Sequence, residues 1–151
     1  MTLELEPVGV VRNGVMGSRD EEWGRVVSEI QLRPELADGL QGLEQFSHVV
    51  VVSFLHEARF DAVTHLNRRP RDRSDMPVMG IFAQRARHRP NPIAITTVEL
   101  KRIEGASLFV RGLDAIDGTP VLDIKPHVPE FDSPTHPRVP EWMERLMEGY
   151  F

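Results

Sequence analysis

The chain has 151 residues, which fits a single domain, and its formal net charge of −5 argues against a general attraction to nucleic acids. It contains no cysteine, so disulfides and cysteine-ligated metal sites are excluded. No apolar run approaches the ~20 residues of a membrane-spanning helix, and the acidic start, Met1–Glu6, lacks the basic region of a signal peptide. We therefore expect one cytoplasmic domain over residues 1–151 with no membrane segment.

The first half of the chain is predicted to be mainly short strands. Val8–Arg12 and Arg25–Leu32 are rich in β-branched residues, and the continuous apolar run in His48–Leu55 favours a buried strand. Pro34–Gly42 is predicted to be a short helix, because proline stands near its start and glycine at its end. Residues 58–77 are polar, arginine-rich and interrupted by prolines, which predicts a long mobile loop.

The second half continues the strand pattern and ends in a helix. Met79–Ala83 is predicted to be a strand, and Ile93–Ile103 and Ser107–Arg111 are separated by a turn that indicates a hairpin. Val121–Ile124 is a further strand, whereas Val139–Tyr150 has the apolar face of a helix. Many short strands with few helical segments predict an all-β fold, a small barrel with short peripheral helices that include a C-terminal one.

Two phrases, Arg89–Ile93 and Asp117–Pro126, are too specific in residue type to be generic surface loops. Proline fixes the φ angle and glycine permits positive φ, so each phrase encodes one particular backbone path. A rigid backbone that presents a few polar groups is what a small-molecule site needs. The polar side chains on these paths are Arg89, Asn91, Asp117, Thr119, Asp123 and Lys125.

With the residues that precede them, Gly80–Arg85 and Gly112–Ile116, the two phrases resemble the TsaA/TrmO-like family. The resemblance also covers Pro7–Arg12, Gly42–His48 and Pro129–Asp132, which extends it over most of the chain. Characterised members of this family are S-adenosylmethionine-dependent tRNA methyltransferases with a β-barrel core, and they are dimers. The resemblance therefore implies a β-barrel, S-adenosylmethionine as the cofactor, a tRNA substrate and a homodimer.

The resemblance also implies which residues contact the cofactor. A guanidinium suits the bidentate contact with a carboxylate, and a carboxylate can accept hydrogen bonds from ribose hydroxyls or from the amino group of S-adenosylmethionine. Without the resemblance, the same residues are equally typical of a strand end, a basic loop and a tight turn. The implied cofactor-binding residues are His56, Glu57, Arg85, Ile95, Asp114, Ala115, Ile116 and Asp117.

Seven arginines crowd the segment Arg68–Arg89, against only Asp72 and Asp75. Such a patch can hold phosphates on an acidic protein, and it is equally typical of a solvated loop. Asp123 and Lys125 alternate along one strand and either form an ion pair or help to hold the preceding turn. The candidate substrate-binding residues are Arg69, Arg71, Arg87, Arg89, Asn91 and Lys125.

In the family the reaction is methyl transfer to the exocyclic nitrogen of a threonylcarbamoyl-modified adenosine next to the tRNA anticodon. A base must take a proton from that nitrogen, and His56, Asp117 and His127 are the candidates. The scattered histidines suggest no metal site. Gly9–Gly14 lacks the third glycine of a dinucleotide-binding fingerprint, which argues against a classical nucleotide-fold methyltransferase. Two alternatives remain: a methyltransferase for another small substrate, and a non-catalytic module that binds S-adenosylmethionine or RNA.

Three features depart from the characterised tRNA enzymes. The segment Asn13–Gly24 lacks the proline-arginine-glutamine loop that those enzymes place on the cofactor, and Ala86 stands where a serine is common. The sequence also ends after one short helix, whereas many bacterial members carry a further C-terminal domain. These departures bear on the substrate, and neither the predicted barrel nor the central phrases are affected by them.

Overall fold

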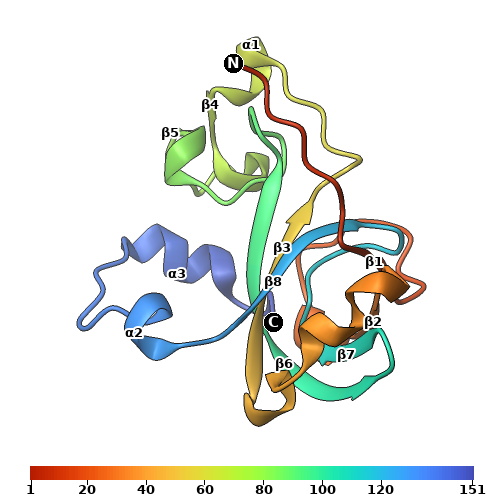
Figure 1. Cartoon of the computed structure of the whole chain (residues 1–151). Coiled ribbons are helices and arrows are strands. Elements are labelled where there is room, and N and C mark those ends of the chain that lie inside the picture. The colour runs from red at the N-terminus through yellow and green to blue at the C-terminus, as the bar shows by residue number, and fades with distance from the viewer.

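The computed structural model describes all 151 residues, and six antiparallel strands form a closed barrel at its centre (Figure 1). The strands are β1 (Gly9–Arg12), β2 (Val27–Leu32), β3 (His48–Phe54), β6 (Ile93–Glu104), β7 (Ser107–Arg111) and β8 (Pro120–Pro126). Around the barrel their order is β1-β2-β7-β6-β3-β8, and β8 pairs with β1 to close it. The all-β barrel expected from the sequence is therefore confirmed.

The barrel is filled by one cluster of eleven buried residues. Successive side chains of a strand point to opposite faces, so alternate residues such as Val49 and Val51 of β3, or Leu108 and Val110 of β7, point inward. Each fully buried side chain of this kind contributes roughly 1.5–3 kcal/mol relative to an exposed one. The cluster is Val11, Ile30, Leu40, Val49, Val51, Val98, Leu108, Val110, Leu113, Ala115 and Val121.

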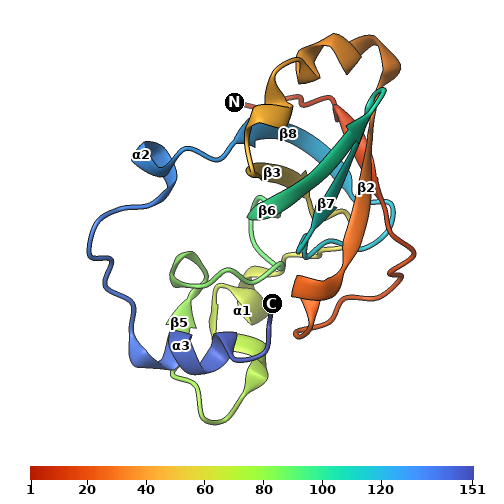
Figure 2. The same cartoon turned by 90° about the horizontal axis from the view of Figure 1, so that it is seen from below.

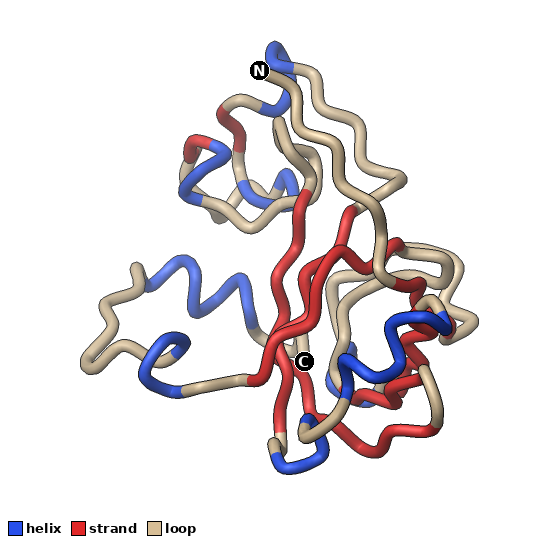
Figure 3. Tube along the Cα trace, in the orientation of Figure 1, coloured by secondary structure: helices blue, strands red, loops and turns tan.

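The helices are all short and lie outside the barrel (Figure 3). Five are 3-10 helices: η1 (Trp23–Arg25), η2 (Pro34–Leu40), η3 (Leu43–Gln45), η4 (Pro70–Asp72) and η5 (Ile81–Ala83). Three are α-helices: α1 (Ala62–His65), α2 (Pro129–Asp132) and α3 (Glu141–Met147). None of them has the length and apolarity needed to cross a membrane. The helix predicted from Pro34 is present as η2, and the strand predicted from Arg25 begins only after η1.

The segment between β3 and β6 forms a small lobe beside the barrel (Figures 1 and 2). Residues 58–77 were expected to be a long loop, but they contain α1, η4 and β4 (Asn67–Arg68), which pairs with β5 (Met79–Gly80). The expected strand Met79–Ala83 is therefore only two residues long and is followed by η5. The buried side chain of Gln84 donates to the carbonyl oxygens of Arg68 and Met79, at 3.0 and 2.8 Å, and holds this two-stranded ribbon together.

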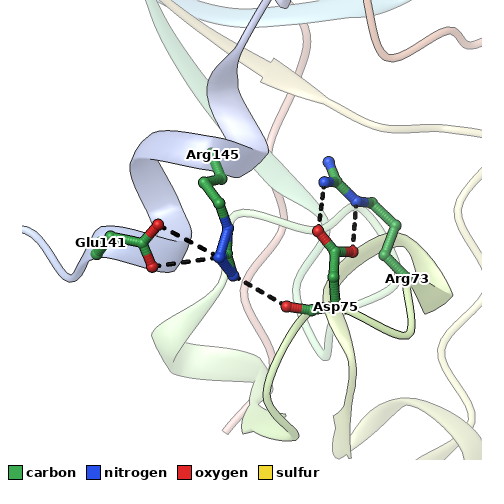
Figure 4. Close-up of polar contacts among 4 residues, drawn as sticks. All are labelled: Arg73, Asp75, Glu141 and Arg145. Carbon is green, nitrogen blue, oxygen red and sulfur yellow. Dashed lines mark hydrogen bonds and ion pairs between the residues drawn. The ribbon is translucent and has the colours of Figure 1, made fainter.

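The C-terminal helix is shorter than the predicted Val139–Tyr150. Pro140 is its N-cap, and the chain leaves the helix before Gly149, whose φ of 69° is left-handed. Arg145 anchors α3 to the lobe, because its guanidinium donates to the carbonyl oxygen of Asp75 at 2.9 Å and pairs with Glu141 (Figure 4). The side chain of Asp75 itself pairs with Arg73 at 2.7 Å (Figure 4).

Strand β6 is the longest strand and changes partners along its length. Its first half pairs with β3, from Ile93 opposite Phe54 to Glu99 opposite His48. Its second half, Glu99–Glu104, pairs with β7. The side of Ile93–Val98 that faces away from β3 therefore has no partner strand, and we call it the open edge of β6. A free strand edge offers unpaired N–H and C=O groups for contacts with side chains or ligands.

Candidate functional site

The open edge of β6 brings together two oppositely charged side chains that the sequence places in the cofactor set. The guanidinium of Arg85 donates from Nη2 to the carbonyl oxygen of Ile95 at 2.5 Å. One residue further along, the hydroxyl of Thr96 donates to Oδ1 of Asp114 at 2.5 Å. The side chain of Ile95 is half exposed between them. A cation, a carboxylate and an apolar surface are thus grouped at two successive residues of one strand.

The carboxylate of Asp114 accepts a second hydrogen bond, from the phenol of Tyr150 to Oδ2 at 2.5 Å. A carboxylate has about four acceptor positions, so about two stay available for another donor. Burial, and then the negative charge of Asp114, raise the pKa of the Tyr150 phenol well above its usual value. Tyr150 therefore stays protonated and acts as a donor to Asp114 at every physiological pH.

Asp117 ties the turn after β7 to the loop after β1. Its Oδ1 accepts from the backbone N–H groups of Asn13, at 2.8 Å, and Gly14, at 3.1 Å, and Oδ2 lies 3.6 Å from Nη1 of Arg12. The N–H of Gly14, then that of Asn13 and then Arg12 hold the pKa of Asp117 below its usual value. The side chain of Asn13 also donates to the carbonyl oxygen of Ala115 at 2.8 Å. These contacts give Asp117 a structural role. Its contact with the cofactor stays a prediction.

Ala115 and Ile116 are both buried, and Ala115 belongs to the barrel cluster. The carbonyl oxygen of Ile116 accepts from both the N–H and the hydroxyl of Thr119, at 3.2 and 2.7 Å. Their side chains therefore support the turn from inside the barrel. Within the stretch from Asp114 to Asp117, Asp114 is the residue whose side chain meets the open edge of β6.

His56 and Asn91 lie where β3 ends and β6 begins. The N–H of Leu55 donates to the carbonyl oxygen of Pro92 at 2.8 Å, and the N–H of Ile93 donates to that of Asn91 at 2.7 Å. His56 is half-buried at this end, and Glu57 beside it is exposed. The open edge of β6 starts at the same end, with Ile93 opposite Phe54 of β3.

His127 lies at the opposite end of β3. Its N–H donates to the carbonyl oxygen of His48 at 3.0 Å, and the two imidazole rings are 6.3 Å apart. His48 is the first residue of β3, a strand of seven residues, which by the usual rise is about 20 Å long. His56 thus lies at the end of β3 where β6 begins, and His127 lies at the opposite end of β3.

Most arginines of the segment Arg68–Arg89 are already engaged within the chain. Ion pairs join Arg68 to Asp72, Arg73 to Asp75 and Arg71 to Asp20, at 2.8, 2.7 and 3.6 Å. The first two acidic partners are visible in the sequence, whereas Asp20 comes from the loop after β1 and is brought in by the fold. Backbone carbonyls accept from three more guanidiniums, since Arg69 donates to Met76, Arg89 donates to Gln84 and Arg85 donates to Ile95.

Arg87 and Lys125 complete the predicted substrate set. Arg87 is exposed and its side chain contacts another side chain only at the ring of His88, 3.2 Å from Nε2. Lys125 forms the ion pair with Asp123 that was one of two options, at 2.8 Å. The roles of both residues in substrate binding stay predictions, and Arg87 is the arginine of the segment whose guanidinium is bonded to neither a carboxylate nor a backbone carbonyl.

Two open hollows on the surface lie away from the open edge of β6. One is lined by Glu4–Pro7, and the other by Arg19–Glu21, Arg71, Arg73 and Glu148. The second mixes both signs of charge and contains one predicted substrate residue, Arg71. No three histidine, aspartate or glutamate side chains are arranged to hold a metal ion.

Three residues of the site were not expected from the sequence. The alternation of β6 places Thr96 on the face that points into the barrel. A polar residue at such an inward position was the signal available in the sequence. Asn13 precedes glycine in a turn-forming pair, which is typical of local capping rather than of the contact it makes with Ala115. Tyr150 gave no signal, because its partner Asp114 is 36 residues away along the chain.

Comparison with known proteins identifies relatives of this chain. Residues 17–133 match the family described as the tRNA-methyltransferase O N-terminal domain. A probable S-adenosyl-L-methionine-binding protein of Methanothermobacter thermautotrophicus is 40% identical over 137 residues, which are 88% of this chain and 96% of that protein. A tRNA (adenine(37)-N6)-methyltransferase of Homo sapiens is 40% identical over 113 residues, which are 73% of this chain and 24% of that protein.

A solved structure and a longer relative agree with this match. The crystal structure of TrmO from Pseudomonas aeruginosa superposes with a TM-score of 0.74 at 34% identity, covering 91% of this chain and 61% of that chain. A probable S-adenosyl-L-methionine-binding protein of Archaeoglobus fulgidus is 38% identical over 148 residues, 95% of this chain but 39% of that protein. This chain therefore spans less than two thirds of the human, Pseudomonas and Archaeoglobus proteins, and nearly all of the Methanothermobacter one.

Proposed function

Because this chain belongs to the family of tRNA-methyltransferase O N-terminal domains, we propose that it binds S-adenosylmethionine and methylates the exocyclic nitrogen of an adenosine in tRNA. The observation that carries the proposal is the pairing of Arg85 and Asp114 with adjacent residues of β6, Ile95 and Thr96. The human relative, a tRNA (adenine(37)-N6)-methyltransferase, supports the reaction class. The finer substrate is the threonylcarbamoyl-modified adenosine next to the anticodon.

The chemistry of the residues at the open edge fits this cofactor. The guanidinium of Arg85 suits the carboxylate of the methionine part, and the free acceptor positions of Asp114 suit ribose hydroxyls or the amino group. The half-exposed side chain of Ile95 offers an apolar surface for the adenine ring. Negative charge at Asp114 also favours a nearby sulfonium. These residues bind and orient the cofactor by complementary charge and shape.

S-adenosylmethionine supplies an electrophilic methyl group on sulfur, and its transfer to nitrogen is an in-line displacement. The chain has to orient the accepting nitrogen and keep water away from it. A base must also take the proton of that nitrogen. Of the three candidates we assign this part to His56, which is half-buried at the end of β3 where β6 begins. Asp117 has a lowered pKa and accepts from three groups of its own chain, and His127 lies at the far end of β3.

The proposal includes a homodimer in the cytoplasm. Large apolar side chains close to the site are exposed, among them Phe82 of η5 and Ile93 and Ile95 of β6. Contact with a second copy would cover them and exclude water from the cofactor. Static light scattering on the purified chain measures the mass in solution directly, and a monomer at micromolar concentration would contradict this part of the proposal.

The central experiment supplies the purified chain with S-adenosylmethionine carrying a labelled methyl group. Two tRNA preparations are compared, one with and one without the threonylcarbamoyl group on the adenosine next to the anticodon. We expect label only in the modified tRNA, and mass spectrometry of the digested nucleosides should place it on that base.

Each alternative has its own outcome in the same experiment. Label in both tRNAs would contradict the finer substrate, and label transferred from the cofactor to a small molecule alone would favour a methyltransferase for another substrate. Cofactor binding by calorimetry without any transfer would favour a non-catalytic binding module. Absence of cofactor binding would overturn the proposed site itself.

A further inference from the structure

The last residues of the chain dock onto the loop that precedes β2. The N–H of Glu22 donates to the carbonyl oxygen of Gly149, and the N–H of Trp23 donates to that of Tyr150, both at 2.9 Å. Trp23 is almost completely buried, and Figure 2 shows the C-terminus beside η1. A Cβ atom at Gly24 would lie 2.6 Å from the carbonyl carbon of Phe151, so the glycine permits this close approach. We call Gly149–Phe151 the docked segment.

The docked segment directs the side chain of Tyr150 to the carboxylate of Asp114. The phenol donates to Oδ2, while Thr96 donates to Oδ1 of the same carboxylate, each at 2.5 Å. The guanidinium of Arg71 lies over the ring, 5.4 Å from its centre, and pairs with Asp20. The ring is therefore held on one face by a cation and at its tip by an anion, and the carbonyl oxygen of Tyr150 accepts from the N–H of Trp23.

We propose that Tyr150 is a positioning residue of the cofactor site, which holds the Asp114 carboxylate in the orientation that S-adenosylmethionine requires. The inference rests on the proposed function, because Asp114 is taken to contact the cofactor. Two donors approach the two oxygens separately and so fix the rotation of the carboxylate plane. The remaining acceptor positions then face a fixed direction, and the cofactor does not have to order them on binding.

Tyr150 lies outside the residues that match the family, whereas the residues around it lie within them. Tyr150 and the helix before it lie outside residues 17–133, whereas Asp114, Thr96 and Trp23 lie within them. The positioning contact therefore joins a segment beyond the matched residues to the matched cofactor site. It also links that site to the loop Asn13–Gly24, where the proline-arginine-glutamine phrase of the characterised enzymes is absent.

The test removes only the phenolic oxygen, in Tyr150→Phe, and measures the Kd for S-adenosylmethionine by calorimetry. We expect roughly a tenfold weaker Kd, the usual effect of losing a hydrogen bond to a charged group. The melting temperature of Tyr150→Phe should remain close to that of the wild type, because the ring and the backbone contacts stay. An unchanged Kd in this folded variant would overturn the inference.

A double-mutant cycle separates positioning from a purely structural effect. Asp114→Asn is made alone and together with Tyr150→Phe, and we expect Tyr150→Phe to add nothing to the loss caused by Asp114→Asn. Additive losses would mean that Tyr150 acts independently of Asp114 and would overturn the inference. If Asp114→Asn alone leaves the Kd unchanged, the proposed cofactor site fails. If Asp114→Asn weakens binding and Tyr150→Phe does not, only the positioning inference fails.

A second variant moves the docked segment without changing either partner of the hydrogen bond. In Gly24→Ala the new methyl group collides with the backbone of Phe151, so the docked segment has to shift. The phenol of Tyr150 is then displaced from the carboxylate of Asp114. We expect a weaker Kd, approaching that of Tyr150→Phe. Gly39→Ala is the matched control, because a Cβ there meets no atom within 4 Å and should leave the Kd unchanged. Equal Kd values for the two glycine variants would overturn the part assigned to the docked segment.

Discussion

The open edge of β6 and the arginine-rich segment Arg68–Arg89 differ in how much polar capacity they leave for a ligand. At the edge, Asp114 keeps about two acceptor positions after its two internal hydrogen bonds. In the segment, carboxylates take up Arg68, Arg71 and Arg73. A high density of arginine in the sequence is therefore not the same as positive charge available at the surface. A few well-placed groups on a strand edge are better candidates for binding.

The largest effect on cofactor binding is expected at Asp114. Asp114→Asn removes the negative charge and exchanges one carboxylate oxygen for an amide nitrogen, which donates hydrogen bonds instead of accepting them. It should therefore weaken the Kd for S-adenosylmethionine by about 10- to 100-fold, or roughly 1.5–3 kcal/mol. Calorimetry measures the change directly. Glu104→Gln is the control, because Glu104 lies at the far end of the same strand in an exposed pair with Arg102. A similar loss in both variants would remove the distinction between the two ends of β6.

The second effect, about tenfold, is expected at Arg85. Arg85→Ala removes the cation that we assign to the cofactor carboxylate, and with it a charge-assisted hydrogen bond. Arg25→Ala is the control, since Arg25 is highly exposed and its carboxylate partner, Glu22, is as far away as 3.9 Å. A folded Arg85→Ala protein that binds S-adenosylmethionine as tightly as the wild type would exclude Arg85 from the site.

The arginine-rich segment itself can be tested through the salt dependence of tRNA binding. Arg87→Ala should flatten the slope of log affinity against log salt by about 0.7–0.9 if its guanidinium neutralises one phosphate. Arg73→Ala should leave the slope unchanged, because its guanidinium is held by two hydrogen bonds to Asp75. Equal slopes for both variants and the wild type would contradict the distinction between committed and uncommitted arginines. Cofactor affinity should be the same in all three.

The smallest effect is expected at Asp117, as a pH dependence of stability. The backbone N–H groups of Gly14 and Asn13, and then Arg12, lower its pKa in the folded state. The carboxylate therefore stabilises the fold above its unfolded pKa of about 3.9, and this contribution is lost as the pH falls through the lower folded value. Asp117→Asn should melt at a lower temperature than the wild type near pH 7.

The difference between the two melting temperatures should begin to shrink below about pH 4, where the carboxylate of the unfolded wild type becomes protonated, and should go on shrinking as the pH approaches the lower folded pKa. Thermal unfolding of both proteins between pH 3 and pH 7, read by circular dichroism, measures it. Asp38→Asn is the control, because Asp38 is an exposed carboxylate of η2. A difference that stays constant down to pH 3 would show that the backbone contacts of Asp117 do not depend on its charge.

Local pattern predicted the elements that carry their own signal. The turn after Ile103 places β7 at Ser107–Arg111 to the residue, and the apolar run after His48 defines β3 to within one residue. The strand β4 was missed and the strand expected at Met79–Ala83 is only the two residues of β5, since two strands of two residues each have no periodicity and depend on the side chain of Gln84. The end of α3 was placed too late, because the left-handed turn at Gly149 and the docked segment interrupt an apolar pattern that continues in the sequence.

The barrel and the family were predictable from the sequence, because turn chemistry, strand alternation and the two proline- and glycine-rich phrases are properties of neighbouring residues. The family resemblance then implied Arg85 and Asp114 as cofactor contacts. Which charges remain free depends on the tertiary structure. Ion pairs such as Arg71 with Asp20, and hydrogen bonds such as Tyr150 with Asp114, join residues far apart in the chain. Their formation depends on the partner change of β6 and on the docking of the last residues beside η1. Such long-range contacts leave no periodic trace in the sequence, and they set both the orientation of Asp114 and the availability of the arginines.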